Sequence, residues 1–372
     1  RARERDRRCG AGVALALACL TRPEGALVFA ASAAGRLVGG AWRSPDERRR
    51  LVLDAMVVAG VVAGHVAFRL WAYGDFLPNT FHAKAGGYWQ RPREYLGGFA
   101  WQHLTPVLAP LPLLALLDRR ATLRAAFLPA LAVLAGGVLA IYAAGTDWMP
   151  GYRLLCPYLP AWTALAGFGI ALLCARVAGR AAPALAGLAM AAAAAGSSAW
   201  QAPVLGASLE DVAAYNVANR RGHEALAAWV AAHARTGQSI ALMDIGVIGV
   251  RLMNLTVVDI SGLTDRHIGR LPGGFLTKQP DADYVLGRRP DFVVLSFAVP
   301  AGRPERARSW TAMERAILEH PEFRRAYARP RTCRAGASQL ERFACLYGAA
   351  QAFDATPRSY RYYQAVFERD RE

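Results

Sequence analysis

The sequence is poor in charge, in lysine and in the short motifs that mark nucleotide or zinc sites. Only 19% of its 372 residues are charged, whereas 54% are hydrophobic, and its mean hydropathy is positive. A chain of this composition is too apolar for an ordinary soluble domain and too long for a single core. The scarcity of charge therefore predicts a membrane protein.

Nucleotide and zinc motifs are also missing. No GxGxxG or other phosphate-cradling glycine loop occurs, which gives no support to a cytosolic nucleotide-sugar or ATP site. The six cysteines form neither a CxxC pair nor a Cys/His cluster, so we expect no zinc site and no cofactor, with a divalent metal left open. Cys333 and Cys345 are the two cysteines of the C-terminal part, and we expect them to form a disulfide if that part lies outside the cytoplasm.

Lysine is nearly absent, although the chain is strongly basic. Of 44 basic residues only Lys84 and Lys278 are lysines, and the net charge is +16. Such a charge suggests a nucleic-acid binder, but aromatic residues interleaved on a basic face are missing. Many arginines lie in short loops between apolar runs, where they orient a membrane protein. We therefore expect a lipid bilayer, and no nucleic acid, among the partners.

Long apolar runs dominate the first 200 residues. A helix needs about 20 apolar residues to cross a hydrocarbon core about 30 Å thick. Seven runs are predicted to span, the first of them short, at about 10–21, 24–40, 51–72, 95–117, 124–144, 154–175 and 182–200. No cleavable signal peptide precedes the first run, so we expect the chain to begin inside a longer protein, with upstream helices missing.

Basic residues gather in every second connection, at residues 1–8, 43–50, 118–124 and 176–180. Short loops rich in arginine stay in the cytoplasm, so the other loops and everything after about residue 201 are expected outside it. The predicted fold is a polytopic α-helical membrane domain over 1–200, followed by a small α/β extracytoplasmic domain over 201–372.

The pattern after residue 200 is mixed. It predicts an amphipathic helix over 220–235, short buried strands at 239–243, 255–260 and 291–297, and a helix over 312–318. Carboxylates that end strands bind a metal or a sugar hydroxyl in some proteins, but more often they cap turns. We expect capping for the carboxylates here, which are Asp244, Asp259 and Asp265; His267 lies in the same loop as Asp265.

Three short polar segments on the predicted outer side carry the functional signal: LTRPEG (20–25), YGDFLPNTFHAK (73–84) and GTDWMPGYR (145–153). Ionisable groups at the edge of hydrocarbon are costly and are functional candidates by default. Each one alone is better explained by snorkelling or by structural ion pairing, but the three segments together favour a site. Helices that begin near Glu24 and Leu154 would both present N-terminal N–H groups to this side, where a phosphate binds well.

Taken in this order, the three segments resemble the bacterial multi-span glycosyltransferases of the GT-C superfamily, and most nearly the actinobacterial terminal β-(1→2) arabinofuranosyltransferases. The strings DIGVIG (244–249) and VDISGLTD (258–265) look like the extracytoplasmic domain of that group. The resemblance implies a multi-pass protein of the bacterial cytoplasmic (inner) membrane. Such an enzyme transfers a sugar from a polyprenyl-monophosphate donor to a glycan, lipid or protein acceptor outside the cytoplasm.

The resemblance also assigns roles to residues. It makes Lys84 and Arg153, with Arg22 as a third, contacts of the donor phosphate. It lines the sugar and acceptor cavity with six residues, Glu24, Asp75, Asn79, His82, Asp147 and Tyr152. In such enzymes a carboxylate of the first extracytoplasmic loop usually serves as the base. That loop is not in this chain. Of the carboxylates that this chain does contain, Asp75 and Asp147 are eligible as the base.

Two other classes of function stay open, namely a transporter or flippase of a lipid-linked sugar and a non-catalytic subunit of envelope assembly. A transporter usually places its site near the membrane midplane on broken helices, whereas the polar residues here gather on one face.

Overall fold

The computed structural model divides into two compact units. The first consists of residues Arg1–Leu77 and Tyr88–Val204, and the second of Pro78–Gly87 and Leu205–Glu372. Residues 78–87, which the sequence placed in the membrane domain, are thus grouped with the C-terminal unit. The structure describes residues 10–22, 24–84, 91–104, 111–117, 121–144, 152–300, 303–357 and 361–370.

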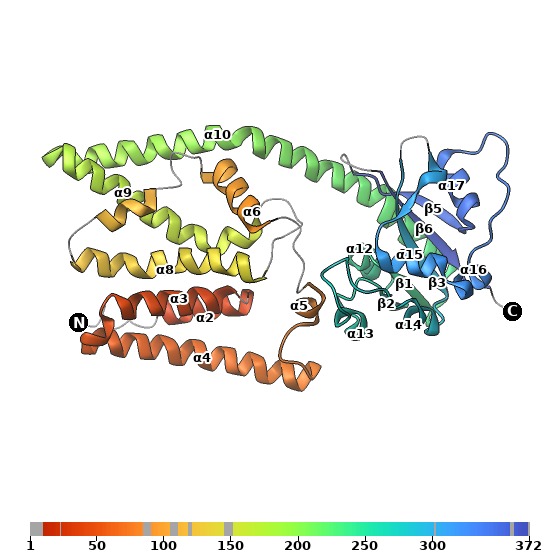
Figure 1. Ribbon diagram of the computed structural model, residues 1–372, viewed down its shortest axis with the longest axis horizontal. Coiled ribbons are helices and arrows are strands. Elements are labelled where there is room, and N and C mark those ends of the chain that lie inside the picture. Colours follow the sequence, from red (N-terminus) through yellow and green to blue (C-terminus); the bar gives the residue numbers. More distant parts are fainter. Residues whose placement is uncertain are drawn as a thin grey trace. The chain divides into compact units, whose positions relative to one another are not determined.

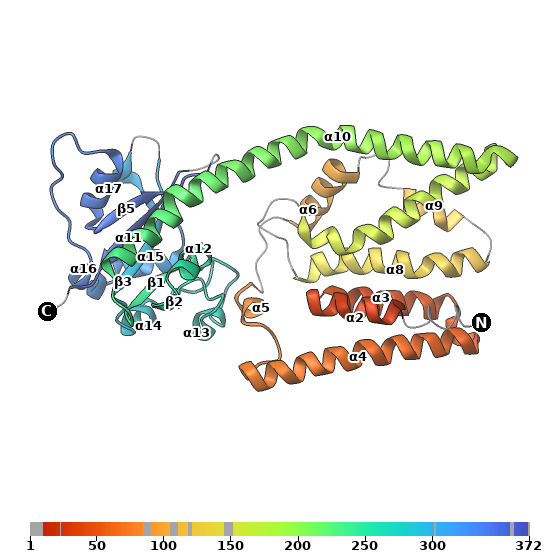
Figure 2. The ribbon, with the colours of Figure 1, turned by 180° about the vertical axis from the view of Figure 1, so that it is seen from behind.

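The first unit is helical, and its longer helices run side by side (Figures 1 and 2). Helix α3 packs on α8, and α2 packs on α4. Gly35 permits the first of these contacts, because a Cβ there would lie 2.5 Å from the backbone of α8. The elements are α2 (Gly10–Thr21), α3 (Glu24–Val38), η1 (Ala41–Arg43), α4 (Pro45–Tyr73), α6 (Pro92–Phe99), a π-helical turn η2 (Ala100–Leu104), η3 (Leu111–Leu117), α8 (Ala121–Ala144), η4 (Arg153–Tyr158), α9 (Leu159–Val177), η5 (Gly179–Ala181) and α10 (Ala182–Asn219).

Three helical stretches are long and apolar enough to cross a membrane, namely Pro45–Tyr73, Arg153–Val177 and Gly179–His233. The prediction of seven spans is not supported by the described residues. Helix α3 has 15 residues, about 22 Å at 1.5 Å per residue, which is shorter than the hydrocarbon core. The run predicted over 95–117 is divided among α6, η2 and η3.

The last long helix also differs from the sequence pattern, which predicted a span ending near 200 and a separate helix over 220–235. Helix α10 continues through Pro203 to Asn219, and a π-helical turn, η6 (Arg220–Glu224), joins it to α11 (Ala225–His233). Hydropathy detects the change from apolar to polar residues near 200, but helical backbone continues through such a change without interruption.

The second unit is built on one mixed sheet with the strand order β2-β1-β3-β6-β5. Strand β1 pairs in parallel with β2 and β3, whereas β6 runs antiparallel to β3 and β5. The three predicted strands are confirmed as β1, β2 and β3, and the predicted helix over 312–318 is confirmed as α15. The strands are β1 (Ser239–Leu242), β2 (Thr256–Asp259), β3 (Phe292–Ala298), β4 (Arg308–Ser309), β5 (Gln351–Asp354) and β6 (Tyr362–Glu368).

Helices cover both faces of this sheet, because side chains alternate between faces along each strand. On one face α11 and α12 (Ile245–Arg251) pack on side chains such as Ile240 and Val294. The opposite face, which includes Val293 and Phe297, is covered by α14 (Ala282–Gly287), α15 (Ala312–Glu319), α16 (Pro321–Ala326) and α17 (Gln339–Tyr347). Three short elements, α5 (Asn79–Lys84), α13 (Arg266–Gly269) and η7 (Pro304–Arg306), complete the unit.

The predicted disulfide is confirmed. Cys333, in the loop before α17, is bonded to Cys345 within α17, and their Cα atoms are 5.7 Å apart. The bond closes a loop of the second unit, the part of the chain that the arginine pattern assigns to an oxidising compartment.

Glu314 is a fully buried carboxyl in the first turn of α15. Its oxygens accept hydrogen bonds from the backbone N–H of Ser296 and Thr311 and from the Thr311 hydroxyl, at 2.8 to 2.9 Å. Burial outweighs these bonds and raises the pKa of Glu314 to about 7.

We expect the stability of the second unit to fall as the pH rises through 7. The folded state holds a proton on Glu314 that the unfolded chain releases near pH 4.5, so this stabilisation is complete below that pH and is lost above about 7. The gap between the two pKa values corresponds to about 3 kcal/mol in all, of which about 2 kcal/mol is lost between pH 5.5 and 8. Hydrogen exchange of the β3 amides at pH 5.5 and 8, corrected for intrinsic rates, measures it.

The variant Glu314→Gln is the control for this prediction. An amide cannot take up the proton, so the pH dependence should disappear. The variant should also be less stable at both pH values, since its NH₂ group faces N–H donors. A pH dependence that survives in Glu314→Gln would assign the effect to another group.

Candidate functional site

Two of the three polar segments meet in the first unit, where α3 contacts η4. Nη2 of Arg22 lies 2.7 Å from Oε1 of Glu24, and these side chains are 40% and 25% exposed, so the pair stays open to a ligand. The charge of Arg153, the first residue of η4, also acts on the Glu24 carboxylate. The charges of Arg22 and Glu24 act in turn on Tyr158 of η4. The structure therefore pairs Arg22 directly with Glu24 and brings Arg153 near enough for its charge to act on the same carboxylate, at the starts of two helical segments.

Tyr152 precedes this cluster and is held by aromatic packing. Its ring lies 5.0 Å from that of Tyr95 and 5.8 Å from that of Phe99, both in edge contacts. Its φ of 49° places it in the left-handed region, which turns the chain sharply into η4. The backbone at Tyr152 thus directs Arg153 toward α3.

Of the two carboxylates that are eligible as a base, the structure describes Asp75 alone. Asp75 closes a turn after α4, where its Oδ1 accepts a hydrogen bond from the Leu77 N–H at 3.2 Å. Asp147 lies outside the described residues.

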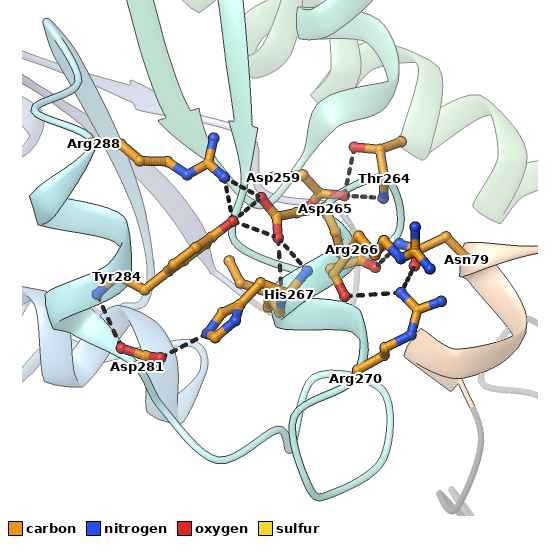
Figure 3. A network of polar contacts seen from close by, with 12 residues as sticks. Asn79, Asp259, Thr264, Asp265, Arg266, His267, Arg270, Asp281, Tyr284 and Arg288 are labelled. Atoms are coloured by element: carbon orange, nitrogen blue, oxygen red, sulfur yellow. Dashed lines mark hydrogen bonds and ion pairs between the residues drawn. The ribbon is translucent and has the colours of Figure 1, made fainter. Parts of the chain in front are cut away.

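Asn79, which the sequence assigned to the sugar and acceptor cavity, anchors α5 to the loop that follows β2 (Figure 3). Its Nδ2 lies within hydrogen-bond distance of the carbonyl oxygens of Gly262, Leu263 and Asp265, at 2.9, 3.2 and 3.0 Å. Its Oδ1 faces Arg270 at 3.5 Å. In the second unit this amide therefore serves as a structural clamp across 183 residues of sequence.

The two lysines of the chain both belong to this region. Lys278 is buried, and its ammonium donates to the carbonyl oxygens of His82 and Leu271 at 3.1 and 3.0 Å. Burial lowers the pKa of Lys278. Lys84 is exposed, and its Nζ lies 5.7 Å from the centroid of the Phe275 ring. One lysine thus fixes α5 in place while the other remains open to solvent at its end.

Removal of the Asn79 amide by Asn79→Ala is expected to release α5 from the loop after β2. Hydrogen bonds of this kind contribute about 1 kcal/mol each, so the loss of these contacts should lower the free energy of local opening by roughly 2 to 3 kcal/mol. Hydrogen exchange should then lose protection at residues 79–84 and 261–265 together. The exposed neighbour is the control, since Thr80→Ala should change neither segment. Unchanged exchange in Asn79→Ala would show that other contacts hold α5.

The loop after β2 contains a further polar network, also drawn in Figure 3. Asp265 accepts from the N–H groups of His267 and Ile268 and so caps α13, and the Tyr284 hydroxyl donates to it at 3.0 Å. The His267 ring stacks on that of Tyr284 and lies 2.8 Å from an oxygen of Asp281. The hydrogen bond to His267 is the main reason that the pKa of Asp281 is lowered.

The capping expected for the strand-end carboxylates holds for Asp259 and Asp265. Asp259 is buried, and its two oxygens accept four hydrogen bonds from the backbone and hydroxyls of Ser261 and Thr264. Such a carboxylate has no capacity left for a metal or a sugar. Among the residues that the structure describes, no group of three His, Cys, Asp or Glu side chains is placed to hold a metal ion. Asp244 is the exception to the capping rule, because it makes no side-chain cap of α12.

The sequence pattern missed the two ion pairs that Arg36 makes in the first unit. Arg36 of α3 pairs with Asp54 of α4 at 2.9 Å, and Asp54 is buried. Glu47 also contacts Arg36, at 3.2 Å. The sequence contained one signal for these pairs, namely Asp54 within the apolar part of α4. An ionisable residue inside a membrane span is costly unless it is paired.

Comparison with known protein families gives one match, which covers part of the second unit. The model of a domain of unknown function (DUF8728) matches residues 212–347, from the end of α10 through α17. No curated protein and no solved structure matches the chain.

Proposed function

We propose that this chain belongs to a membrane glycosyltransferase of the GT-C type, which moves a sugar from a polyprenyl-monophosphate donor to an extracytoplasmic acceptor. The observation that supports the proposal best is the convergence of Arg22, Glu24 and Arg153. These residues come from two segments more than a hundred residues apart, each just before or at a helix start. Helices long enough to cross a membrane and a separate α/β unit are in keeping with this class of enzyme.

The chemistry follows from charge. When the sugar leaves its carrier, negative charge develops on the phosphate oxygen. Fixed cations in a site poor in water stabilise that charge more than they stabilise the bound donor, and so accelerate the reaction. We propose Arg153 as the main contact and Arg22, shared with Glu24, as a weaker one. The family resemblance gives Lys84 the same role.

The acceptor hydroxyl must lose a proton to a carboxylate as it attacks the sugar. Asp75 and Asp147 are the eligible groups of this chain, and Glu24 is engaged by Arg22. We propose that the base comes from the loop upstream of residue 1, as the resemblance implies. Tyr152, next to Arg153, would then act on the acceptor side by positioning.

The proposed topology is the one that the arginine pattern indicates, with residues 73–94 and 201–372 outside the cytoplasm of a bacterial cell. The described helices support a membrane protein in general, and the finer assignment belongs to this proposal.

The test is direct. Full-length protein in nanodiscs is incubated with a radiolabelled polyprenyl-monophosphate sugar, and the release of polyprenyl phosphate is measured. Release that depends on the protein supports a transferase. If no release occurs but the labelled lipid crosses the bilayer of proteoliposomes, the protein is a flippase. If neither occurs, a non-catalytic assembly role is favoured.

A further inference from the structure

One face of the sheet turns polar at the carboxyl ends of the parallel strands. Along β3, Ser296 continues the row of Phe292 and Val294 that packs under α11 and α12. Along β6, Gln364 lies opposite Ser296, and Val366, two residues later, lies opposite Val294 in the same row. Ser296 and Gln364 are both buried. Buried polar groups on an otherwise apolar sheet face are costly and call for a reason.

Asp244 completes this polar end of the sheet. It follows β1, and its Oδ2 accepts hydrogen bonds from the Tyr362 hydroxyl at 2.6 Å and from Nε2 of Gln364 at 2.8 Å. Nε2 of His223, in η6, lies 3.4 Å from the same oxygen. The Asp244 side chain is nevertheless 31% exposed, so a ligand can reach it. Burial is the main cause that raises the pKa of Tyr362 well above its usual range, which keeps its hydroxyl a donor.

The position of Asp244 is the one where open α/β sheets bind ligands. From β1 the chain passes to β2 on one side, and it returns to β3 on the other side of β1. Ligands of such sheets bind outside the carboxyl ends of the strands at this change of direction. Asp244 is the second residue after β1 and lies at that point.

Two acceptors at this position lack a donor. Within the part of the chain that the structure describes, neither Oδ1 of Asp244 nor Oε1 of Gln364 has a hydrogen-bond partner. Gln364 is fully buried, and an unsatisfied buried amide oxygen costs about 1 to 3 kcal/mol. Oε1 of Gln364 has no exposed surface, so Oδ1 of Asp244 is the atom that a ligand reaches, and because it accepts, its partner is a donor such as a hydroxyl group.

The surroundings narrow the class of ligand. The negative charge of Asp244 acts on Tyr362 and disfavours a phosphate. His223 beside Asp244 disfavours a ligand cation, since it becomes positive when protonated. The half-buried Trp310 ring lies 5.0 Å from that of Tyr362 and offers an apolar surface. Hydroxyl donors beside an apolar face are the features of a sugar ring.

We propose that Asp244, Tyr362 and Trp310 form a subsite for a neutral sugar ring, whose hydroxyl groups donate to Oδ1 of Asp244, while the buried Gln364 holds the other oxygen of that carboxylate. That this sugar belongs to the acceptor glycan rests on the proposed transferase function. Binding itself requires neither donor nor turnover.

Saturation-transfer difference NMR tests the subsite with full-length protein in nanodiscs. The probes are the methyl glycosides of D-arabinofuranose, D-mannopyranose and D-galactopyranose, with choline as a cationic probe. We expect at least one glycoside to give a signal that falls at least fivefold in Asp244→Asn. An asparagine still accepts from Tyr362 and Gln364 through one oxygen, but it turns an NH₂ group toward the ligand. Asp283→Asn, at a side chain that is 93% exposed, should keep the full signal.

The outcomes separate this proposal from the transferase proposal, because no reaction is measured. No glycoside signal, an undiminished signal in Asp244→Asn, or a signal from choline alone would overturn the subsite even if polyprenyl phosphate is released. If Asp244→Asn does not fold, Trp310→Leu takes its place. Loss of glycoside signal in that variant supports the subsite, and retention contradicts it.

Discussion

Replacement of Arg153 by alanine in the full-length protein is expected to reduce the release of polyprenyl phosphate about 100-fold or more at saturating donor. This is the size of effect that follows the loss of one group that stabilises developing charge in a transition state. Arg153 is half-buried at the start of η4, and its charge already acts on Glu24. A guanidinium held there would stabilise the leaving phosphate without reorganisation.

Two further variants define the role of Arg153. Arg180→Ala removes an exposed arginine beyond the opposite end of α9 and should leave turnover unchanged. Arg153→Lys keeps the charge but loses the planar fork, so it should recover only part of the activity. Near-normal turnover by Arg153→Ala would exclude the assignment. Failure of Arg153→Ala to fold, with Arg153→Lys folded and fully active, would make the residue a structural partner of Glu24.

Lys84→Ala is expected to have an effect of similar size, about 100-fold on turnover, if the ammonium contacts the donor phosphate. The structure shows this side chain exposed at the end of α5, with Phe275 as an aromatic neighbour. An exposed contact between a cation and a ring contributes only about 0.5 to 1 kcal/mol, so stability should change little. Turnover and thermal unfolding of the same preparation measure both effects.

Phe275→Leu is the matched control for Lys84, because it removes the ring and leaves the lysine. Under the catalytic assignment this variant keeps most of its activity while Lys84→Ala loses it. If both variants lose the same activity, Lys84 acts through its packing on Phe275. If Lys84→Ala turns over normally at saturating donor, the residue has no part in the chemistry.

The sequence by itself determined those features that depend on local pattern. Short apolar runs identified the buried strands β1, β2 and β3, and the helix α15 was predicted over 312–318. Cys333 and Cys345 were paired by exclusion, because the soluble part contains no other cysteine. The abundance of apolar residues indicated membrane helices, since that signal depends on composition within one stretch of chain. It did not fix their number, because helix length depends on backbone geometry.

Only the tertiary structure decided what each polar side chain does. Asn79 reads as a cavity residue in the sequence, yet its amide binds carbonyl groups more than 180 residues away. Asp259 and Asp244 end neighbouring strands in the same way. Asp259 is satisfied by residues within five positions, whereas Asp244 meets Tyr362 and Gln364 from a strand more than 110 residues further along. The partners of a polar side chain depend on which distant segments the tertiary fold brings next to it. Hydrophobic periodicity is a local property of the sequence and does not contain that information.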